Sequence, residues 1–293
     1  MAHVLCLIAD AERDPLEAGV VNELIRALGG AVRWLADGEA CELAVEGDPK
    51  AALAHARAAT AGMAVDVCVL PAAHRQKQAL VCDLDSTIIT IETIDELADW
   101  AGVKAEVAAI TRRAMRGELD FAMALRARVK LLEGLPETIF EEVYRERARL
   151  MPGARTLVRT MRARGATTAL VSGGFLPVAE RVQAEVGFDL VQANTLEVAD
   201  GRLTGRVTPP IVGPDAKLAM LERLRMERRL AAEQTLAVGD GANDLPMLLA
   251  AGLGVAYHAH APVARQAPVT IEHADLRALL FLQGIAKRDF VLT

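Results

Sequence analysis

The chain has 293 residues, of which 52% are hydrophobic, 25% are charged and 3% are aromatic. This length allows one large domain or two unequal domains, and the apolar fraction predicts a well-buried core built mainly from Ala, Leu and Val. The formal charge of −6 argues against a nucleic-acid partner, because nucleic-acid-binding surfaces normally carry a basic excess.

The cysteines and the apolar runs indicate the compartment. Cys6, Cys41, Cys68 and Cys82 share no CxxC spacing, which favours buried free thiols over disulfides or a zinc site. The apolar run near the N-terminus stops too early for a signal peptide, and the longest uncharged apolar stretch, 245–257, is too short to cross a bilayer. We therefore expect a soluble, cytoplasmic protein without a membrane partner.

Residues 1–75 have a pattern of their own, which predicts a first domain. Apolar periodicity predicts strands and helices in the order βαββαβ, at residues 3–8, 16–28, 31–35, 41–45, 49–60 and 65–70. This order is the ferredoxin-like split-βαβ arrangement. The segment carries no recognisable catalytic motif, and the polar stretch 72–78 is typical of a linker.

A second domain is predicted at 79–293, where short buried strands alternate with long helices, as in an α/β doubly wound parallel sheet. Three of its strands end abruptly in polar residues, just before Asp83, Ser172 and Asp240. Because ligands bind at the carboxyl ends of the strands in such sheets, these clusters predict one shared site. A helical insertion at about 94–150 is expected to cover that site as a cap.

The first cluster is DLDST, from Asp83 to Thr87. Two carboxylates at positions i and i+2 after a strand can point to the same side, so Asp83 can attack phosphorus while Asp85 shuttles a proton. Taken alone, the motif fits a helix N-cap about equally well. A calcium loop of the EF-hand type does not fit, because its sixth position requires Gly and here it is Ile88.

The other clusters supply what a phosphate ester needs. VSGG places the Ser172 hydroxyl before two glycine amides at an expected helix start, which suits a phosphate. GDGAND offers Asp240 and Asp244 as hard oxygen ligands for Mg²⁺, with Asp83 as a third. Lys217, expected just before a helix, can place a fixed positive charge beside the phosphate. Each motif alone is also compatible with an ordinary turn or a surface position.

Together these motifs resemble the haloacid dehalogenase superfamily of phosphatases, and within it the phosphoserine phosphatases. The resemblance runs from about residue 80 to the mid-270s, on the strings DLDSTII, ETIDELA, LDFAMALRARVKLLEGLP, VSGGF and GDGANDLPML. It implies a Rossmann-like core with a helical cap, and an Mg²⁺-dependent enzyme.

The resemblance also implies roles for individual residues. Asp83 would be the nucleophile and Asp85 the general acid and base. Asp83, the backbone carbonyl of Asp85, and Asp240 would bind Mg²⁺, while Asp244 would orient the water ligands of the metal. The phosphate would be held by Ser172, Gly173 and Lys217, with Asn243 beside it.

In the cap, the resemblance assigns Glu92 to the ammonium group of an amino-acid substrate and Arg128 to its carboxylate. Phe121 precedes Arg128 by seven residues, a spacing that places both on one helix face. Met115 and Phe121 would close an apolar wall against water. Outside the family context, ordinary roles are favoured instead, with Phe121 in the cap core and Arg128 and Glu92 as solvated helix charges.

Two short stretches depart from the family pattern. Gly213 and Pro214 stand before Lys217, where the family commonly has an acidic and a small residue. His258 and His260 form an HxH where the family often has a lysine, and a surface loop explains them better than a metal site.

The N-terminal 75 residues resemble the small ACT-like domains that precede some phosphoserine phosphatases. Such domains bind amino acids or mediate dimers in some proteins, so an amino-acid effector and a homodimer both stay open as partners of this chain.

The sequence thus supports three functional hypotheses. The leading one is hydrolysis of O-phospho-L-serine to L-serine and phosphate through an aspartyl-phosphate at Asp83, the last step of L-serine biosynthesis. The second keeps the chemistry but replaces the substrate with another small phosphomonoester, or transfers the phosphoryl group to an acceptor alcohol. The third makes the chain an amino-acid sensor whose phosphatase activity is secondary.

Overall fold

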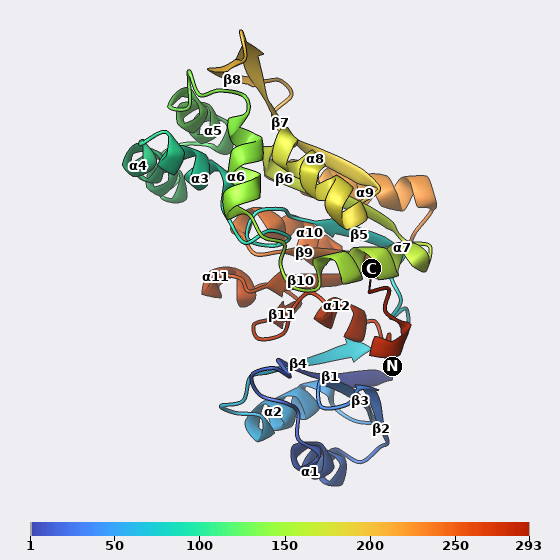
Figure 1. The fold of residues 1–293 in the computed structure, drawn as a ribbon. Helices are drawn as coiled ribbons and strands as arrows, with labels where there is room; N and C mark the ends of the chain where they lie inside the picture. The colour runs from blue at the N-terminus through green and yellow to red at the C-terminus, as the bar shows by residue number, and fades with distance from the viewer. Residues whose placement is uncertain (1, 293) are drawn as a thin grey trace.

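The computed structural model describes residues 2–292. It contains two sheets, one of four strands and one of seven. Figure 1 shows the smaller sheet at one end of an elongated molecule, the larger sheet in the middle, and the helices of the cap toward the other end.

The four-stranded sheet is antiparallel and its strands lie in the order β2-β3-β1-β4. Its elements in chain order are β1 (His3–Ala9), α1 (Ala18–Leu28), β2 (Val32–Ala36), β3 (Ala40–Val45), α2 (Pro49–Ala59) and β4 (Val65–Pro71). This order confirms the predicted ferredoxin-like arrangement and fits an ACT-like domain.

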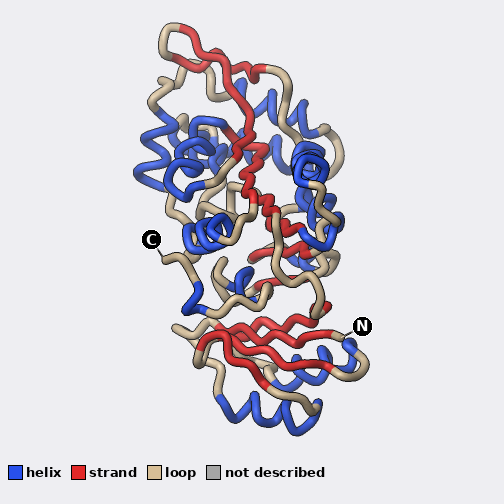
Figure 2. The backbone as a smooth tube through the Cα atoms, turned by 90° about the vertical axis from the view of Figure 1, so that its right-hand side faces the viewer, coloured by secondary structure: helices blue, strands red, loops and turns tan. Residues whose placement is uncertain are grey.

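Both faces of this small sheet are covered. Helices α1 and α2 pack on the face that carries Leu5 and Leu7. The opposite face carries Cys6 and Ile8, which belong to the same apolar cluster as Phe281 near the C-terminus. Figure 2 shows this face of the small sheet turned toward the rest of the molecule. One hydrophobic core therefore runs from the N-terminal sheet into the central part of the protein.

Polar contacts fix the same interface. The buried carboxylate of Asp66, in β4, accepts hydrogen bonds of 2.7 to 3.3 Å from the backbone amides of residues 272–274. Arg75, in the predicted linker, donates to the carbonyl oxygen of Leu282 at 2.7 Å and to Glu42 at 3.1 Å. These contacts hold the N-terminal sheet against the C-terminal segment.

The seven-stranded sheet confirms the doubly wound α/β fold. Its strand order is β11-β10-β9-β5-β6-β7-β8, and all neighbours are parallel except the β7–β8 hairpin. The strands are β5 (Ala79–Cys82), β6 (Thr167–Phe175), β7 (Leu190–Ala199), β8 (Arg202–Thr208), β9 (Thr235–Gly239), β10 (Leu253–Tyr257) and β11 (Val269–Ile271).

Helices cover both faces of this sheet. Successive residues of a strand point to opposite faces, so Leu80 packs with one apolar cluster and Val81 with the other. Helices α7 and α8 contribute to the first cluster, and α9 and α10 to the second. The covering helices are α7 (Ala154–Ala163), α8 (Leu176–Val182), α9 (Pro214–Arg228), α10 (Leu245–Ala250), α11 (Ala261–Ala264) and α12 (Ala278–Phe281).

The segment between β5 and β6 is helical, as predicted for the cap. It contains α3 (Thr93–Trp100), α4 (Lys104–Met115), α5 (Phe121–Lys130) and α6 (Ile139–Arg147). Helix α5 also packs on β8 of the protruding hairpin. The cap and the hairpin thus lie together at one end of the central sheet (Figure 1).

Cys6, Cys41, Cys68 and Cys82 are buried free thiols, as predicted. Within residues 2–292, the structure contains no helix that is both long and apolar enough to cross a membrane.

Candidate active site

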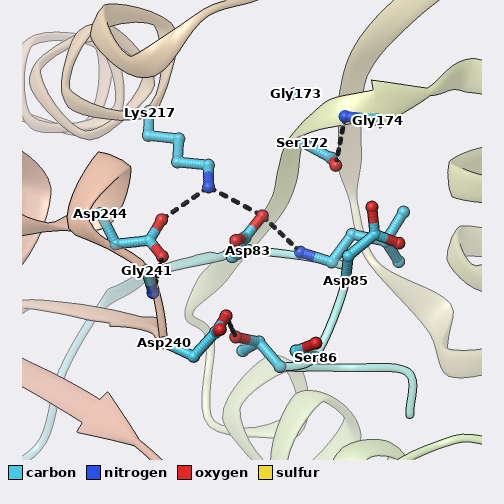
Figure 3. Close-up of polar contacts among 12 residues, drawn as sticks. Asp83, Asp85, Ser86, Ser172, Gly173, Gly174, Lys217, Asp240, Gly241 and Asp244 are labelled. Carbon is cyan, nitrogen blue, oxygen red and sulfur yellow. Dashed lines mark hydrogen bonds and ion pairs between the residues drawn. The ribbon is translucent and has the colours of Figure 1, made fainter. Parts of the chain in front are cut away.

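Three neighbouring strands of the central sheet carry the polar side chains of the site. Asp83 follows β5, Asp240 follows β9 and Ser172 lies in β6, and these strands are adjacent in the order β9-β5-β6. All three are parallel, so their carboxyl ends meet at one edge of the sheet. Figure 3 shows the side chains converging at this edge, where the sequence pattern placed them.

Lys217 ties two carboxylates together at the centre of the site. Its ammonium nitrogen lies 2.8 Å from Asp83 Oδ1 and 2.6 Å from Asp244 Oδ1, and its side chain is 2% exposed (Figure 3). Burial by itself lowers the pKa of Lys217, but the charges of Asp83 and Asp244 outweigh it and raise the pKa to about 12. The lysine therefore stays protonated and acts as a fixed positive charge.

The position of Lys217 differs from the sequence-based prediction, which placed it just before a helix. It lies in the first turn of α9, which begins at Pro214. Proline is favoured at the first helical position, because its fixed φ suits the helix and its missing amide hydrogen would have no partner there. The helix therefore starts earlier than expected, and its first turn directs the lysine into the site.

The nucleophile candidate, Asp83, is held by one of its two oxygens. Besides Lys217, the backbone amide of Leu84 donates to Asp83 Oδ1 at 2.7 Å. Within residues 2–292, no hydrogen bond reaches Asp83 Oδ2. One oxygen is thus anchored, and the other is available to react or to bind a cation.

The carboxylates of Asp83, Asp240 and Asp244 form a cluster that can hold a metal ion, because one oxygen from each lies within 4.8 Å of the others. Three acids face the single charge of Lys217, so the cluster has uncompensated negative charge. Burial, and then the charge of Asp83, raise the pKa of Asp240 and raise that of Asp244 to about 7. The residues therefore fit a hard divalent cation.

The carboxylates of Asp240 and Asp244 differ in how many of their oxygens already accept hydrogen bonds. Thr87 donates to Asp240 Oδ1 at 2.9 Å, and Asp240 is half-buried. Both oxygens of the buried Asp244 accept hydrogen bonds, one from Lys217 at 2.6 Å and one from the Gly241 amide at 2.9 Å. Asp240 thus keeps an oxygen free for direct metal binding, whereas Asp244 is better placed to orient its neighbours.

Asp85 lies on the side of Asp83 away from Lys217, next to Gly174 of β6 (Figure 3). Its carboxylate accepts a hydrogen bond of 2.5 Å from the Thr93 hydroxyl, which fixes its orientation. Burial first, and then the charge of Glu92, raise the pKa of Asp85 well above its usual value. A Cβ atom at Gly174 would lie 2.8 Å from Asp85 Oδ2, so only glycine allows this close approach.

The sequence predicted that the Ser172–Gly174 segment starts a helix, but the structure shows that it does not. It belongs to β6, which continues to Phe175 because Phe175 pairs with β7 after a register shift, and α8 begins only at Leu176. The Ser172 hydroxyl accepts a hydrogen bond of 2.8 Å from the Gly174 amide. A hydroxyl and glycine backbone at a strand end still form a small polar cradle.

A cavity of about 500 Å³ lies above these groups, between the central sheet and the cap. The lining residues that the sequence predicted for the site are Asp83, Asp85, Glu92, Met115, Phe121, Arg128, Ser172, Gly173, Asp240 and Asn243. The other two predicted residues, Lys217 and Asp244, are buried beside the cavity and contact its lining through Asp83 and Gly241. The structure therefore brings all the predicted residues to one site.

The cap side of the cavity carries charges of both signs. The guanidinium of Arg128 is half-buried, and its only hydrogen bond among the described residues goes from Nε to the Ala124 carbonyl oxygen at 3.3 Å. Burial lowers the pKa of Arg128. Glu92 accepts a hydrogen bond of 2.7 Å from the Ser86 hydroxyl. Among residues 2–292, Arg128 therefore faces the cavity without an acidic partner. Glu92 also faces it, and burial raises the pKa of its carboxyl group.

The two apolar cap residues are not equally enclosed. Phe121 is half-buried, whereas Met115 is 82% exposed although it lines the cavity. The predicted apolar wall is therefore formed by Phe121 in this conformation, and Met115 lies at the open rim.

Several lining or supporting residues were missed by sequence reasoning. Thr87 lies in the motif DLDSTII and Thr93 in ETIDELA. Their short distance in sequence from Asp83 and Asp85 was the signal that could have indicated a place in the site. His260 lies at the rim of the cavity, whereas Nε2 of His258 is 3.0 Å from the Ala274 carbonyl oxygen, so the two side chains have different surroundings. The remaining unpredicted lining residues are Ile94, Thr111, Ala114, Leu119, Ala124, Leu125, Phe175 and Gly241. Gly174 also lines the cavity, as the second glycine of the predicted VSGG motif.

Comparison with known proteins assigns the family. The family model described as haloacid dehalogenase-like hydrolase matches residues 80–249, which include both the cap and the three strand-end clusters. The chain belongs to the haloacid dehalogenase-like hydrolases. This membership agrees with an α/β core in which an aspartate follows the central strand.

Several relatives of this hydrolase are named phosphoserine phosphatases. A phosphoserine phosphatase of Streptomyces coelicolor is 47% identical over 254 residues, which cover 85% of this chain and 62% of the relative. The chain thus spans only about three fifths of the length of that relative. A probable phosphoserine phosphatase from Vibrio cholerae, solved in an unliganded form, is 32% identical with a TM-score of 0.78, covering 98% of this chain and 88% of the other.

A further solved structure is described as a phospho-aspartyl intermediate analogue of phosphoserine phosphatase. It is 40% identical to this hydrolase with a TM-score of 0.64, and the match covers 70% of this chain and 98% of the other.

Proposed function

We propose that the protein hydrolyses O-phospho-L-serine to L-serine and phosphate, as the last step of L-serine biosynthesis. One observation carries this choice of substrate. The cavity that exposes Asp83 also presents the half-buried Arg128, which has no acidic partner among residues 2–292. The carboxylate of an amino acid would supply that partner, and Glu92 would pair with its ammonium group. The names of the relatives support the same substrate.

Asp83 is the proposed nucleophile. Lys217 and the Leu84 amide hold Oδ1, so Oδ2 can attack phosphorus. The new Asp83–phosphorus bond forms as the bond from phosphorus to the serine oxygen breaks. Asp85 gives its proton to that oxygen, so that serine leaves as a neutral alcohol.

The aspartyl-phosphate is then hydrolysed. A water molecule loses a proton to Asp85 and attacks phosphorus, which breaks the bond to Asp83 and releases phosphate. Ser172, Gly173, Lys217 and Asn243 are proposed to hold the phosphate oxygens through both steps. Their positive and hydrogen-donating groups stabilise the charge that spreads over these oxygens.

Mg²⁺ is the proposed cofactor. Asp83, Asp240 and the backbone carbonyl of Asp85 would bind it, and Asp244, whose two oxygens are already hydrogen-bonded, would orient its water ligands. When bound, the cation neutralises charge on the phosphoryl oxygens.

The cap residues are proposed to select and enclose the substrate. Glu92 and Arg128 would hold the two ends of the amino acid, and Phe121 would exclude water beside it. Met115 would complete this wall when the cap closes, because it lines the cavity but is exposed in the present conformation.

The proposal is tested by assaying phosphate release with Mg²⁺ across phosphorylated amino acids and sugar phosphates. We expect phosphoserine to be the best substrate, and chelation of the metal to abolish turnover. Asp83→Asn keeps the shape of the side chain but should remove turnover, whereas Asp37→Asn, at an exposed position of the N-terminal domain, should not. A sugar phosphate with a higher kcat/KM would refute the substrate, and a folded, active Asp83→Asn protein would refute the mechanism.

Other features of the protein stay predictions from the sequence. They are the division into domains at 1–75 and 79–293 with a cap at about 94–150, the cytoplasmic location, the homodimer and the amino-acid effector of the N-terminal domain.

A further inference from the structure

A buried amide in β7 joins two segments of the active site. Asn194 is fully buried, and its side-chain nitrogen donates to the carbonyl oxygens of Gly173 and Val212, each at 2.9 Å. Its side-chain oxygen accepts from the Val212 amide at 2.8 Å. Both hydrogens and the oxygen of this amide are therefore used, and the orientation of the amide is set by its partners.

Each joined segment leads directly to a proposed phosphate-binding group. Gly173 follows Ser172 in β6. Val212 precedes Gly213 and the start of α9, whose first turn carries Lys217. Within residues 2–292, no backbone hydrogen bond pairs Gly173 with Val212 directly. The Asn194 side chain thus fixes the distance between two segments that both have to contact the same phosphate.

The same two segments form a seat for the cap. A Cβ atom at Gly173 would lie 2.9 Å from Cζ of Phe121, and one at Gly213 would lie 3.3 Å from Cδ1 of the same ring. The ring at the start of α5 therefore fits against two positions without side chains. This seat gives a physical reason for Gly213, where the sequence departs from the family pattern.

We propose that Asn194 is a positioning residue that holds the Ser172–Gly173 cradle and the Val212–Gly213 segment at the separation that both the phosphate and the Phe121 ring require. This inference rests on the proposed phosphatase activity, but not on phosphoserine being the substrate. A shift of about 1 Å in a positioned group costs about 100-fold in rate, so the effect should appear in the chemistry and not only in stability.

The first test replaces the amide with a side chain of similar size, in Asn194→Leu. The matched control is Gln283→Leu, because Gln283 is also buried and also makes three side-chain hydrogen bonds, but to Lys77, Leu279 and Met161, none of which lines the cavity. Both variants should lower the midpoint of thermal unfolding, because each leaves buried polar groups unpaired.

The kinetics should separate the two variants. For Asn194→Leu, kcat is expected to fall about 10- to 100-fold with both phosphoserine and p-nitrophenyl phosphate, and inhibition by orthovanadate should weaken in parallel. Gln283→Leu should stay within about twofold of the wild type. Equal kinetics in the two variants would overturn the proposal, as would a loss confined to phosphoserine. A wild type that cleaves p-nitrophenyl phosphate but not phosphoserine would refute only the proposed substrate.

A second test does not depend on the folding of the Asn194 variant. Gly213→Ala adds the methyl group that would crowd Phe121, so it should raise KM or lower kcat for phosphoserine by about tenfold. In a Phe121→Leu background, where the ring is gone, the same substitution should have little further effect. Additive effects of the two substitutions would show that the Phe121 ring does not contact Gly213 during turnover, and would refute this part of the proposal.

Discussion

Removing the Arg128 guanidinium is the sharpest test of how the cavity chooses its substrate. Arg128 is half-buried and donates only to the Ala124 carbonyl oxygen among the described residues, so Arg128→Ala leaves no buried acid unpaired. The proposed bond to the substrate carboxylate is charge-assisted and worth about 1.5 to 3 kcal/mol. At 1.4 kcal/mol for each factor of ten, kcat/KM for phosphoserine should fall about 10- to 100-fold.

The assay compares phosphoserine with p-nitrophenyl phosphate, which has no carboxylate and should lose less than about threefold. The control is Arg126→Ala, on the same helix α5, where the side chain is exposed and should not affect either substrate. An equal fall for both substrates would mean that Arg128 supports the cap and does not bind a carboxylate. An equal effect of Arg126→Ala would point to the net charge of the helix instead.

Three further outcomes follow from the structure. Thr87→Ala removes the donor to Asp240 Oδ1, so about 10- to 100-fold more Mg²⁺ should be needed for half-maximal activity, and an unchanged Mg²⁺ titration would contradict this. Gly254→Ala would place a Cβ atom 1.9 Å from the Leu248 carbonyl oxygen and should cost about 2 to 3 kcal/mol, whereas an unchanged unfolding midpoint would disprove the close packing. Deletion of residues 2–75 should lower the unfolding midpoint and promote aggregation, because it uncovers the apolar surface around Phe281; a stable, soluble truncation would show that this interface contributes little.

The strand-end motifs were predictable because local sequence determines where a polar group stands relative to a strand. Asp83 and Asp240 directly follow β5 and β9, and parallel strands must bring their ends to one edge. The elements of the N-terminal sheet were predicted within about two residues for the same reason, since each has a clear apolar period.

The contacts that complete the site were not predictable, because they join residues far apart in the chain. Asn194 has no periodic or motif signal, and its importance comes from the packing of β6 and the segment before α9 against β7. The start of α9 at Pro214 did have a signal, since proline favours the first helical turn. Pro214 was interpreted only as a departure from the family pattern, so the helix was expected to start later.

The burial of both faces of the N-terminal sheet was also predictable from the sequence of β1. Strand β1 has a continuous run of five buried residues, from Leu5 to Ala9, with no polar alternation. An antiparallel sheet with one face in water alternates apolar and polar residues, so a continuous apolar run predicts cover on both faces. The structure supplies this cover with α1 and α2 on one side and the central core on the other.

This double cover limits how an amino-acid sensor in the N-terminal domain can work. Within residues 2–292 both faces of the small sheet are covered, so an effector would have to act at an edge or on the helices. The edge strand β4 contacts β11 of the central sheet. Strand β11 is followed in the sheet by β10 and then by β9, which ends just before Asp240, so this edge is connected to the active site. An isolated fragment of residues 1–75 would expose Cys6 and Ile8, which are buried in the intact protein, so ligand binding to the fragment would not report on the full chain. The sensor hypothesis can therefore be decided only in the full chain, where an effector site predicts that L-serine still binds to the Arg128→Ala protein, which lacks the proposed carboxylate partner of the active site.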